Sequence, residues 1–185
     1  MIATDDEDIY ERALLLRNHS IVTTGIDSFG DLDYRYDVVD IGCDYSQNEL
    51  NAGFLLAQLD KLDSFIERKK HIARLYDKHL DGIKHVSIPK KMREHIYSLY
   101  IIKIDKNRDS FARELKEKGV YTYLHFTPMH LLSYYKTKYS LRVNNYPKAL
   151  RNYQQVLSLP IYPSLKDSDV EYIIESIKSV AKTRV

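Results

Sequence analysis

The chain has 185 residues, of which 44% are apolar, and its formal net charge is +2 at pH 7. This length allows one domain or two small ones with a real hydrophobic core, and the apolar content is ordinary for a globular protein. We take lysine and arginine to be spread along the chain, which argues against a dedicated nucleic-acid surface or a polybasic membrane surface.

Cysteine usage and the first residues predict the cellular compartment. Cys43 is the only cysteine, so no internal disulfide can form, and a reducing cytoplasm is the expected setting. Residues 1–3 run directly into the acidic stretch Asp5–Asp8, which is unlike a secretory signal. No run approaches the roughly 18 apolar residues of a membrane span. We therefore predict a cytoplasmic protein that does not cross a membrane.

The N-terminal quarter is predicted to contain one helix and little other regular structure. Thr4 and Glu7 have the spacing of a capping box, which opens a helix through about Asn18. Residues 19–37 are typical of a loop, because they are rich in Thr, Gly, Asp and Ser, and residues 38–41 favour a brief strand. The residues expected on the buried face of the helix are Ile9, Ala13 and Leu16.

The longest predicted helix covers residues 47–80. Ser46 and Glu49 have the S-x-x-E spacing of a capping box, and Gly82 is the expected C-terminal cap. Apolar residues recur three, four or seven positions apart, as one face of a helix requires. The first turns are apolar almost all round, so protein should cover both sides of the helix there.

The residues after this helix alternate between predicted strands and helices. The expected strands are residues 86–88 at an edge, 97–104, 120–126 and the short extended piece 157–160. The expected helices are one from Asn107 or Asp109 to Gly119, one turn at 131–135, one over 146–156 and one from Asp167. The residues expected to be buried on these helices are Phe111, Leu115, Val170, Ile174, Ile177 and Val180.

Two histidines flank a proline at the end of a predicted strand, where loops often carry function. His125 and His130 lie on either side of Pro128. Two interpretations stay open, a substrate-binding pair or a pair of histidines without a functional role. A metal site would need a third ligand, and none lies at ligand spacing, so we predict no metal.

A polar segment just before the predicted long helix is the second candidate site. It contains Asp44, Tyr45 and Ser46. The free amides of a helix N-terminus favour anions such as phosphate, so an anion site and a simple helix cap are the two alternatives. Cys43 is expected to be a small packed residue rather than a nucleophile, because no histidine is near it in sequence. The residues alone identify no catalytic group.

Several motifs occur in an order that is typical of a known family. The central motif consists of Gly42, Asp44–Ser46, Glu49–Leu50, Ala52–Gly53 and Gln58–Leu59. Five further stretches occur in the family's order, residues 1–6, 14–19, 36–42, 124–130 and 157–163, and residues 36–42 lead directly into the central motif. Together they resemble the DegT/DnrJ/EryC1/StrS family of sugar aminotransferases, which use pyridoxal phosphate.

The resemblance implies an α/β fold, the C-terminal part of a fold-type I transferase that depends on pyridoxal phosphate. Residues 1–46 would be the tail of the large cofactor-binding domain, residues 47–82 a long connecting helix, and residues 83–185 a small α+β domain. The family moves an amino group from glutamate to a keto-sugar linked to a nucleotide diphosphate, usually as a homodimer. Its products enter surface polysaccharides and glycosylated metabolites.

The resemblance also implies which site residues this chain holds. The family's Schiff-base lysine lies before the position that matches Met1, so the chain is expected to have no catalytic residue and to be inactive alone. Its partner would be the N-terminal half or a second subunit. Asp44 and Ser46 match cofactor-binding positions, where the family often has Asn and Arg, and an aspartate would repel phosphate unless protonated or turned away. The implied substrate-binding residues are Tyr45, His125 and His130.

A function of a different class stays open, namely a non-catalytic binding or interaction module that kept the small domain. An exposed apolar surface at residues 50–59 would favour the half-enzyme, because the large-domain partner of that surface would be missing. A cooperatively folded monomer would favour the module.

Overall fold

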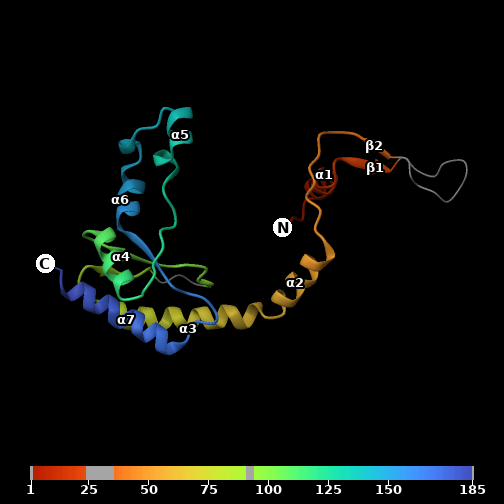
Figure 1. The fold of residues 1–185 in the computed structure, drawn as a ribbon. Coiled ribbons are helices and arrows are strands. Elements are labelled where there is room, and N and C mark those ends of the chain that lie inside the picture. The colour runs from red at the N-terminus through yellow and green to blue at the C-terminus, as the bar shows by residue number, and fades with distance from the viewer. Residues whose placement is uncertain (1, 24–35, 91–93, 185) are drawn as a thin grey trace, which may run out of the picture. The chain divides into compact units, whose positions relative to one another are not determined.

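The computed structural model describes residues 2–23, 36–90 and 94–184. Contacts divide the chain into an N-terminal unit, Met1–Asp60, and a C-terminal unit, Lys61–Val185. Figure 1 shows the elements of each unit. Within the described ranges, every helix is too short or too polar to span a lipid bilayer.

The described residues of the N-terminal unit form two helices and a two-stranded sheet. Its elements are α1 (Glu7–Arg17), β1 (Ile21–Thr23), β2 (Tyr36–Val38) and α2 (Glu49–Leu59). The strands pair antiparallel, with Ile21 opposite Val38. The predicted loop at residues 19–37 therefore contains a strand at its start, and its residues 24–35 lie outside the described ranges.

Both helices of this unit begin at caps that differ from the predicted capping boxes. The Asp6 carboxylate accepts a hydrogen bond from the Ile9 amide at 3.1 Å, at the start of α1. The Asn48 side chain accepts from the Asn51 amide at 2.8 Å, at the start of α2. Asp and Asn are as good at this position as Ser and Thr. The capping-box spacing alone therefore identified the wrong N-cap residues for both helices.

The prediction of one helix over residues 47–80 is wrong, because the chain forms two helices there. Turn residues Asp60 and Lys61 separate α2 from α3 (Leu62–Leu80). The Ser64 hydroxyl donates to the Lys61 carbonyl at 2.7 Å. Such local side-chain bonds offer the backbone an alternative to helix continuation.

The N-terminal unit has no hydrophobic core among its described residues. Neither helix buries a residue, and Ser20 is the one buried residue in the described part of this unit. Ile9, predicted to be buried, is 51% exposed, and Phe54 on α2 is 73% exposed. Short helices and a lone hairpin are marginally stable without packing. The described residues of this unit therefore lack the packing that usually stabilises such elements.

The C-terminal unit is built on a three-stranded antiparallel sheet with strand order β3-β4-β5. Its strands are β3 (Val86–Ser87), β4 (Tyr100–Ile104) and β5 (Val156–Leu159), and its longest helices are α3, α4 (Arg108–Glu117) and α7 (Asp167–Lys182). Helix α7 packs beside α3 (Figure 1). The shorter elements are η1 (Met129–Leu131), α5 (Ser133–Lys138), η2 (Val143–Asn145) and α6 (Pro147–Gln155).

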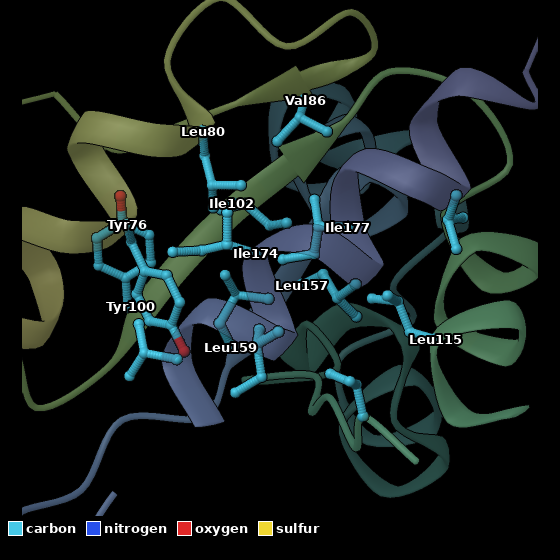
Figure 2. Close-up of a cluster of buried hydrophobic side chains, with 14 of the residues drawn as sticks. Tyr76, Leu80, Val86, Tyr100, Ile102, Leu115, Leu157, Leu159, Ile174 and Ile177 are labelled. Atoms are coloured by element: carbon cyan, nitrogen blue, oxygen red, sulfur yellow. The ribbon is translucent and has the colours of Figure 1, made fainter. Parts of the chain in front are cut away.

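The hydrophobic core of the described chain lies entirely in the C-terminal unit, between residues 72 and 181. Figure 2 shows the side chains that α3, α4, α7 and the sheet contribute. Tyr76 and Tyr100 are fully buried, and the Tyr100 hydroxyl donates to Asp77 at 2.6 Å. The predicted buried residues that are confirmed are Phe111, Leu115, Val170, Ile174, Ile177 and Val180.

Charge is divided unevenly between the units, so the assumption of evenly spread cations is wrong. Residues 1–60 contain 13 acidic residues and 3 arginines, a formal charge of −10. Residues 61–185 contain 13 acidic and 25 basic residues, a formal charge of +12. The first lysine in the sequence is Lys61. The net charge of +2 therefore conceals two strongly charged parts.

Candidate functional site

The loop that contains Asp44 is held against the end of α1 by main-chain hydrogen bonds. The amides of Cys43 and Tyr45 donate to carbonyls of the last residues of α1, at 2.8 and 3.0 Å. Gly42 is required for this approach, because a Cβ atom there would lie 2.3 Å from the main-chain carbon of His19. The loop position is thus fixed by backbone contacts.

Asp44 and Ser46, the predicted cofactor-binding pair, bond to each other. The Ser46 amide donates to Asp44 Oδ1 at 3.1 Å. Hydrogen bonds from the Ser46 hydroxyl and from its amide hold the pKa of Asp44 below its usual value, so the carboxylate stays charged. A phosphate here would meet a negative charge. The pair as placed does not fit pyridoxal phosphate, and its cofactor-binding role stays a prediction.

Tyr45 and Cys43, in the same loop, are both exposed. Tyr45 is 74% exposed, and a hydrogen bond with Cys43 raises the pKa of its hydroxyl. The prediction that Cys43 is a packed residue is wrong, because its unit has no described core to pack against. A substrate role for Tyr45 stays a prediction.

His125 is held by a buried serine of the sheet. Its Nδ1 atom lies 2.8 Å from Ser158 Oγ, and Ser158, on β5, is 3% exposed. The predicted strand at 120–126 is wrong. Tyr123 alone forms a bridge, through two main-chain hydrogen bonds with Ser158. This bridge brings the His125 ring beside Ser158 on the edge strand β5.

His130 has a different environment from His125. It lies in η1, is 4% exposed, and packs its ring 5.1 Å from the ring of Tyr146. Its Nε2 atom has no hydrogen-bond partner among the described residues. No ring contact joins the two histidines within residues 94–184. Their shared substrate role stays a prediction.

Ser158 is the site residue that sequence reasoning missed. It belongs to the motif at residues 157–163, but its pairing with Tyr123 and its bond to His125 depend on the sheet register. The register of strands that are distant in sequence cannot be predicted from a local sequence pattern. Ser158 thus orients His125, which is half-buried, whereas His130 is buried.

We expect Ser158→Ala to lower the free energy of unfolding by about 1 kcal/mol, the usual net contribution of one hydrogen bond. The substitution removes the hydroxyl group that forms a hydrogen bond with His125 Nδ1. Urea unfolding followed by circular dichroism measures the change, with exposed Ser164→Ala as the matched control. An equal effect of the two variants would contradict a role for this bond.

A cavity of about 570 Å³ lies near this segment, beside the start of α4. Arg108 is part of its lining and is 9% exposed, but its guanidinium donates to the Tyr153 carbonyl and pairs with Asp109. Neither His125 nor His130 lines it. Its lining residues are Asn107, Arg108, Asp109, Ser110, Arg113, Leu124, Tyr153 and Gln154.

Solved aminotransferases have the same fold over almost all of this chain. TlmJ from Streptoalloteichus hindustanus gives a TM-score of 0.84 at 27% identity, covering 98% of this chain and 47% of that one. Spr1654 from Streptococcus pneumoniae, assigned as a sugar aminotransferase and solved in a PLP-form, gives 0.85 at 28% identity, covering 97% and 45%. The chain therefore has the fold of the matching part of fold-type I pyridoxal-phosphate-dependent transferases, as predicted.

The family follows from the sequence match. The model of the DegT/DnrJ/EryC1/StrS aminotransferase family matches residues 1–178, and the chain belongs to this family. It is 28% identical to the spore coat polysaccharide biosynthesis protein SpsC of Bacillus subtilis, over 98% of this chain and 49% of SpsC. It is 30% identical to the uncharacterized protein MJ1066 of Methanocaldococcus jannaschii, over 97% and 49%. The chain spans about half the length of these curated relatives.

Proposed function

We propose that the chain is the C-terminal portion of an aminotransferase. The complete enzyme would use pyridoxal phosphate to move an amino group from glutamate to a nucleotide-linked keto-sugar, in polysaccharide or surface-glycan biosynthesis. The observation that carries this proposal is the sugar aminotransferase match over residues 1–178, together with a span of about half the relatives' length. A homodimer of the complete enzyme, in the cytoplasm, is part of the proposal.

The proposal includes inactivity of this chain by itself. No lysine precedes Lys61, and the charged Asp44 disfavours the cofactor phosphate. The lysine that holds the cofactor would come from the other half. In this division, residues 1–46 are the tail of the large domain, residues 47–82 connect the domains, and residues 83–185 form the small domain.

The exposed helix α2 supports a large-domain partner. Leu50 and Phe54 are 81% and 73% exposed, and Leu55 and Leu59 are 60% and 62% exposed. At about 100° per residue, these two pairs lie on roughly opposite sides of the helix. A flat partner could cover only one side, so α2 fits a groove inside a larger domain better than a simple contact with one surface.

The test is complementation. DNA on either side of the gene is sequenced for a reading frame that encodes the part of the relatives unmatched here, including a lysine. The two products are then expressed together with pyridoxal phosphate. Amino transfer from glutamate by the mixture, and by neither chain alone, is the expected result. Transaminase activity or saturable cofactor binding by this chain alone would overturn the proposal.

Within the complemented enzyme, we expect Asp44→Asn to tighten pyridoxal phosphate binding about fivefold. Removing a charge about 4 Å from a phosphate is worth about 1 kcal/mol in water. The pKa of Asp44 is already below its usual value, so lowering the pH from 7 to 5 should not give the same gain. Fluorescence titration measures the affinity, with Asp37→Asn as the control. An equal gain in the control would contradict a local effect of Asp44.

One observation favours the alternative, a binding module without catalysis. Every buried hydrophobic residue of the described chain lies between residues 72 and 181, so the C-terminal unit has a core of its own. If the purified chain is a monomer that binds no hydrophobic dye, the module is favoured and the half-enzyme is not. Light scattering and dye fluorescence decide between the two.

A further inference from the structure

The cavity beside the start of α4 is lined by residues of α4, of α6 and of the segment around Leu124. Its volume of about 570 Å³ is that of a small-molecule site. Figure 1 shows α4 and α6 near each other, and the Arg108 guanidinium donates to the Tyr153 carbonyl at 3.0 Å. Arg108 is buried, and Ser110, Leu124 and Tyr153 are half-buried. The lining is therefore part of the packed C-terminal unit.

The first turn of α4 presents main-chain donors at this cavity. Asn107, the residue before the helix, has φ +50° and ψ +52°, and no side chain caps the amides of the first turn within residues 94–184. Such amides need an acceptor, and the N-terminus of a helix favours an anion. The uncapped start of this ten-residue helix is one indication of a negatively charged ligand.

Arg108 supplies a second, independent indication, because it has a buried donor without an acceptor. Its side chain is 9% exposed, and its Nε atom has no hydrogen-bond partner among the described residues. The Asp109 carboxylate lies 3.2 Å from that atom, within ion-pair distance, but without the alignment of a hydrogen bond. Buried polar atoms of native proteins are nearly always paired. The polar side of the cavity is thus incomplete without a further acceptor.

Arg113 adds a positive charge that the described chain does not compensate. It is exposed, lines the cavity, and forms no hydrogen bond or ion pair with another described residue. Asp109 lies four residues before it, at the spacing of a helical ion pair, yet the Asp109 carboxylate pairs with Arg108 instead. The described lining therefore carries two positive charges and one negative charge. A ligand with one negative charge would balance them.

We propose that this cavity binds a small organic acid with a single carboxylate group. Arg113 and the amides at the start of α4 hold the carboxylate, because an arginine fork and main-chain amides both match its oxygens. The amides of Asn107 and Gln154 bind the polar groups of the ligand. The site goes beyond the proposed aminotransferase function and does not rest on it, because no described lining residue is a histidine or a lysine.

The charges of the lining also define what the site disfavours. Asp109 is its one described acidic residue and is already paired with Arg108, so no free carboxylate remains to pair with an ammonium group. Amino acids should therefore bind more weakly than hydroxy acids of the same size. A dianion would exceed the single charge available and would meet the Asp109 carboxylate.

The experiment is an NMR titration of the isotope-labelled 185-residue chain with sodium lactate at fixed ionic strength. We expect saturable shifts of the Ser110 amide signal. Arg113→Gln should weaken binding about fivefold or more, because hydrogen bonds to charged groups contribute more than neutral ones. Asp109→Asn should tighten binding about fivefold, because it removes a like charge from the lining and frees Arg108 for the ligand.

Arg74→Gln is the matched control for these variants. Arg74 is an exposed arginine on α3, a helix that contributes no described lining residue. The substitution removes the same charge from the chain, so a local site predicts a loss of less than about twofold. Circular dichroism checks that each variant is folded.

Two analogues of lactate test the assignment to a carboxylate. Lactamide has the same carbon skeleton without the charge, and alanine has an ammonium group in place of the hydroxyl. Both should bind about fivefold more weakly than lactate, or less tightly still. The proposal would be overturned by absence of saturable shifts with lactate, by equal losses in Arg74→Gln and Arg113→Gln, by equal binding of either analogue, or by tighter binding of sulfate.

Discussion

Replacing Phe111 with alanine is expected to lower the free energy of unfolding by about 3–5 kcal/mol, the range for truncating a buried phenylalanine. Phe111 is fully buried on α4. The Arg184 guanidinium lies 5.0 Å from its ring centroid and also pairs with Glu114 at 2.6 Å. The substitution would therefore remove core packing and the surface on which Arg184 rests. Urea unfolding of the full chain, followed by circular dichroism, measures the change.

Phe126→Ala is the matched control for this measurement. Phe126 is 77% exposed, so the same truncation should change the unfolding free energy by no more than about 0.5 kcal/mol. If the two variants lose similar stability, the core does not lie where α4 packs. A loss confined to Phe111→Ala supports a single cooperative core in the C-terminal unit.

Replacing Phe54 with aspartate is expected to abolish amino transfer by the complemented enzyme, with association weakened at least hundredfold. Burying a phenylalanine contributes about 1.5–3 kcal/mol, and an unpaired carboxylate in the same place costs several kcal/mol more. The chain alone should keep its stability, because Phe54 is 73% exposed in a unit without a described core. The activity of the mixture measures the loss of complementation, and urea unfolding of the single chain measures its stability.

Gln58→Asp is the control on the same helix. Gln58 and Asn51 form the narrow polar side of α2, between its two apolar sides. A carboxylate at Gln58 adds the same charge without replacing an apolar contact, so complementation should persist. Equal loss with both variants would point to charge alone and would contradict burial of α2 in a partner.

Helices of the C-terminal unit could be predicted because their apolar residues recur at helical spacing. Phe111 and Leu115 on α4, and Val170, Ile174 and Ile177 on α7, face the core as predicted. Periodicity reports which face is buried, and in this unit there is a core for that face to contact. The same reasoning failed for Ile9 on α1, since no core lies beneath it among the described residues.

Strand pairing could not be predicted from local pattern. Residues 120–126 alternate as a strand would, yet only Tyr123 pairs, with Ser158. Alternation reports which side chains face inward, whereas pairing depends on a strand distant in sequence. For the same reason the sequence identified His125 as a candidate but not the serine that orients it.

The uneven charge of the two units predicts how the molecule behaves in solution. With −10 in residues 1–60 and +12 in residues 61–185, the chain is a block polyampholyte, whose overall pI of about 8.4 describes neither block. At low ionic strength, opposite blocks of different molecules should attract one another. Salt shortens the range of that attraction to about 10 Å at 0.1 M. The chain is therefore expected to be salted in, with turbidity that added sodium chloride clears.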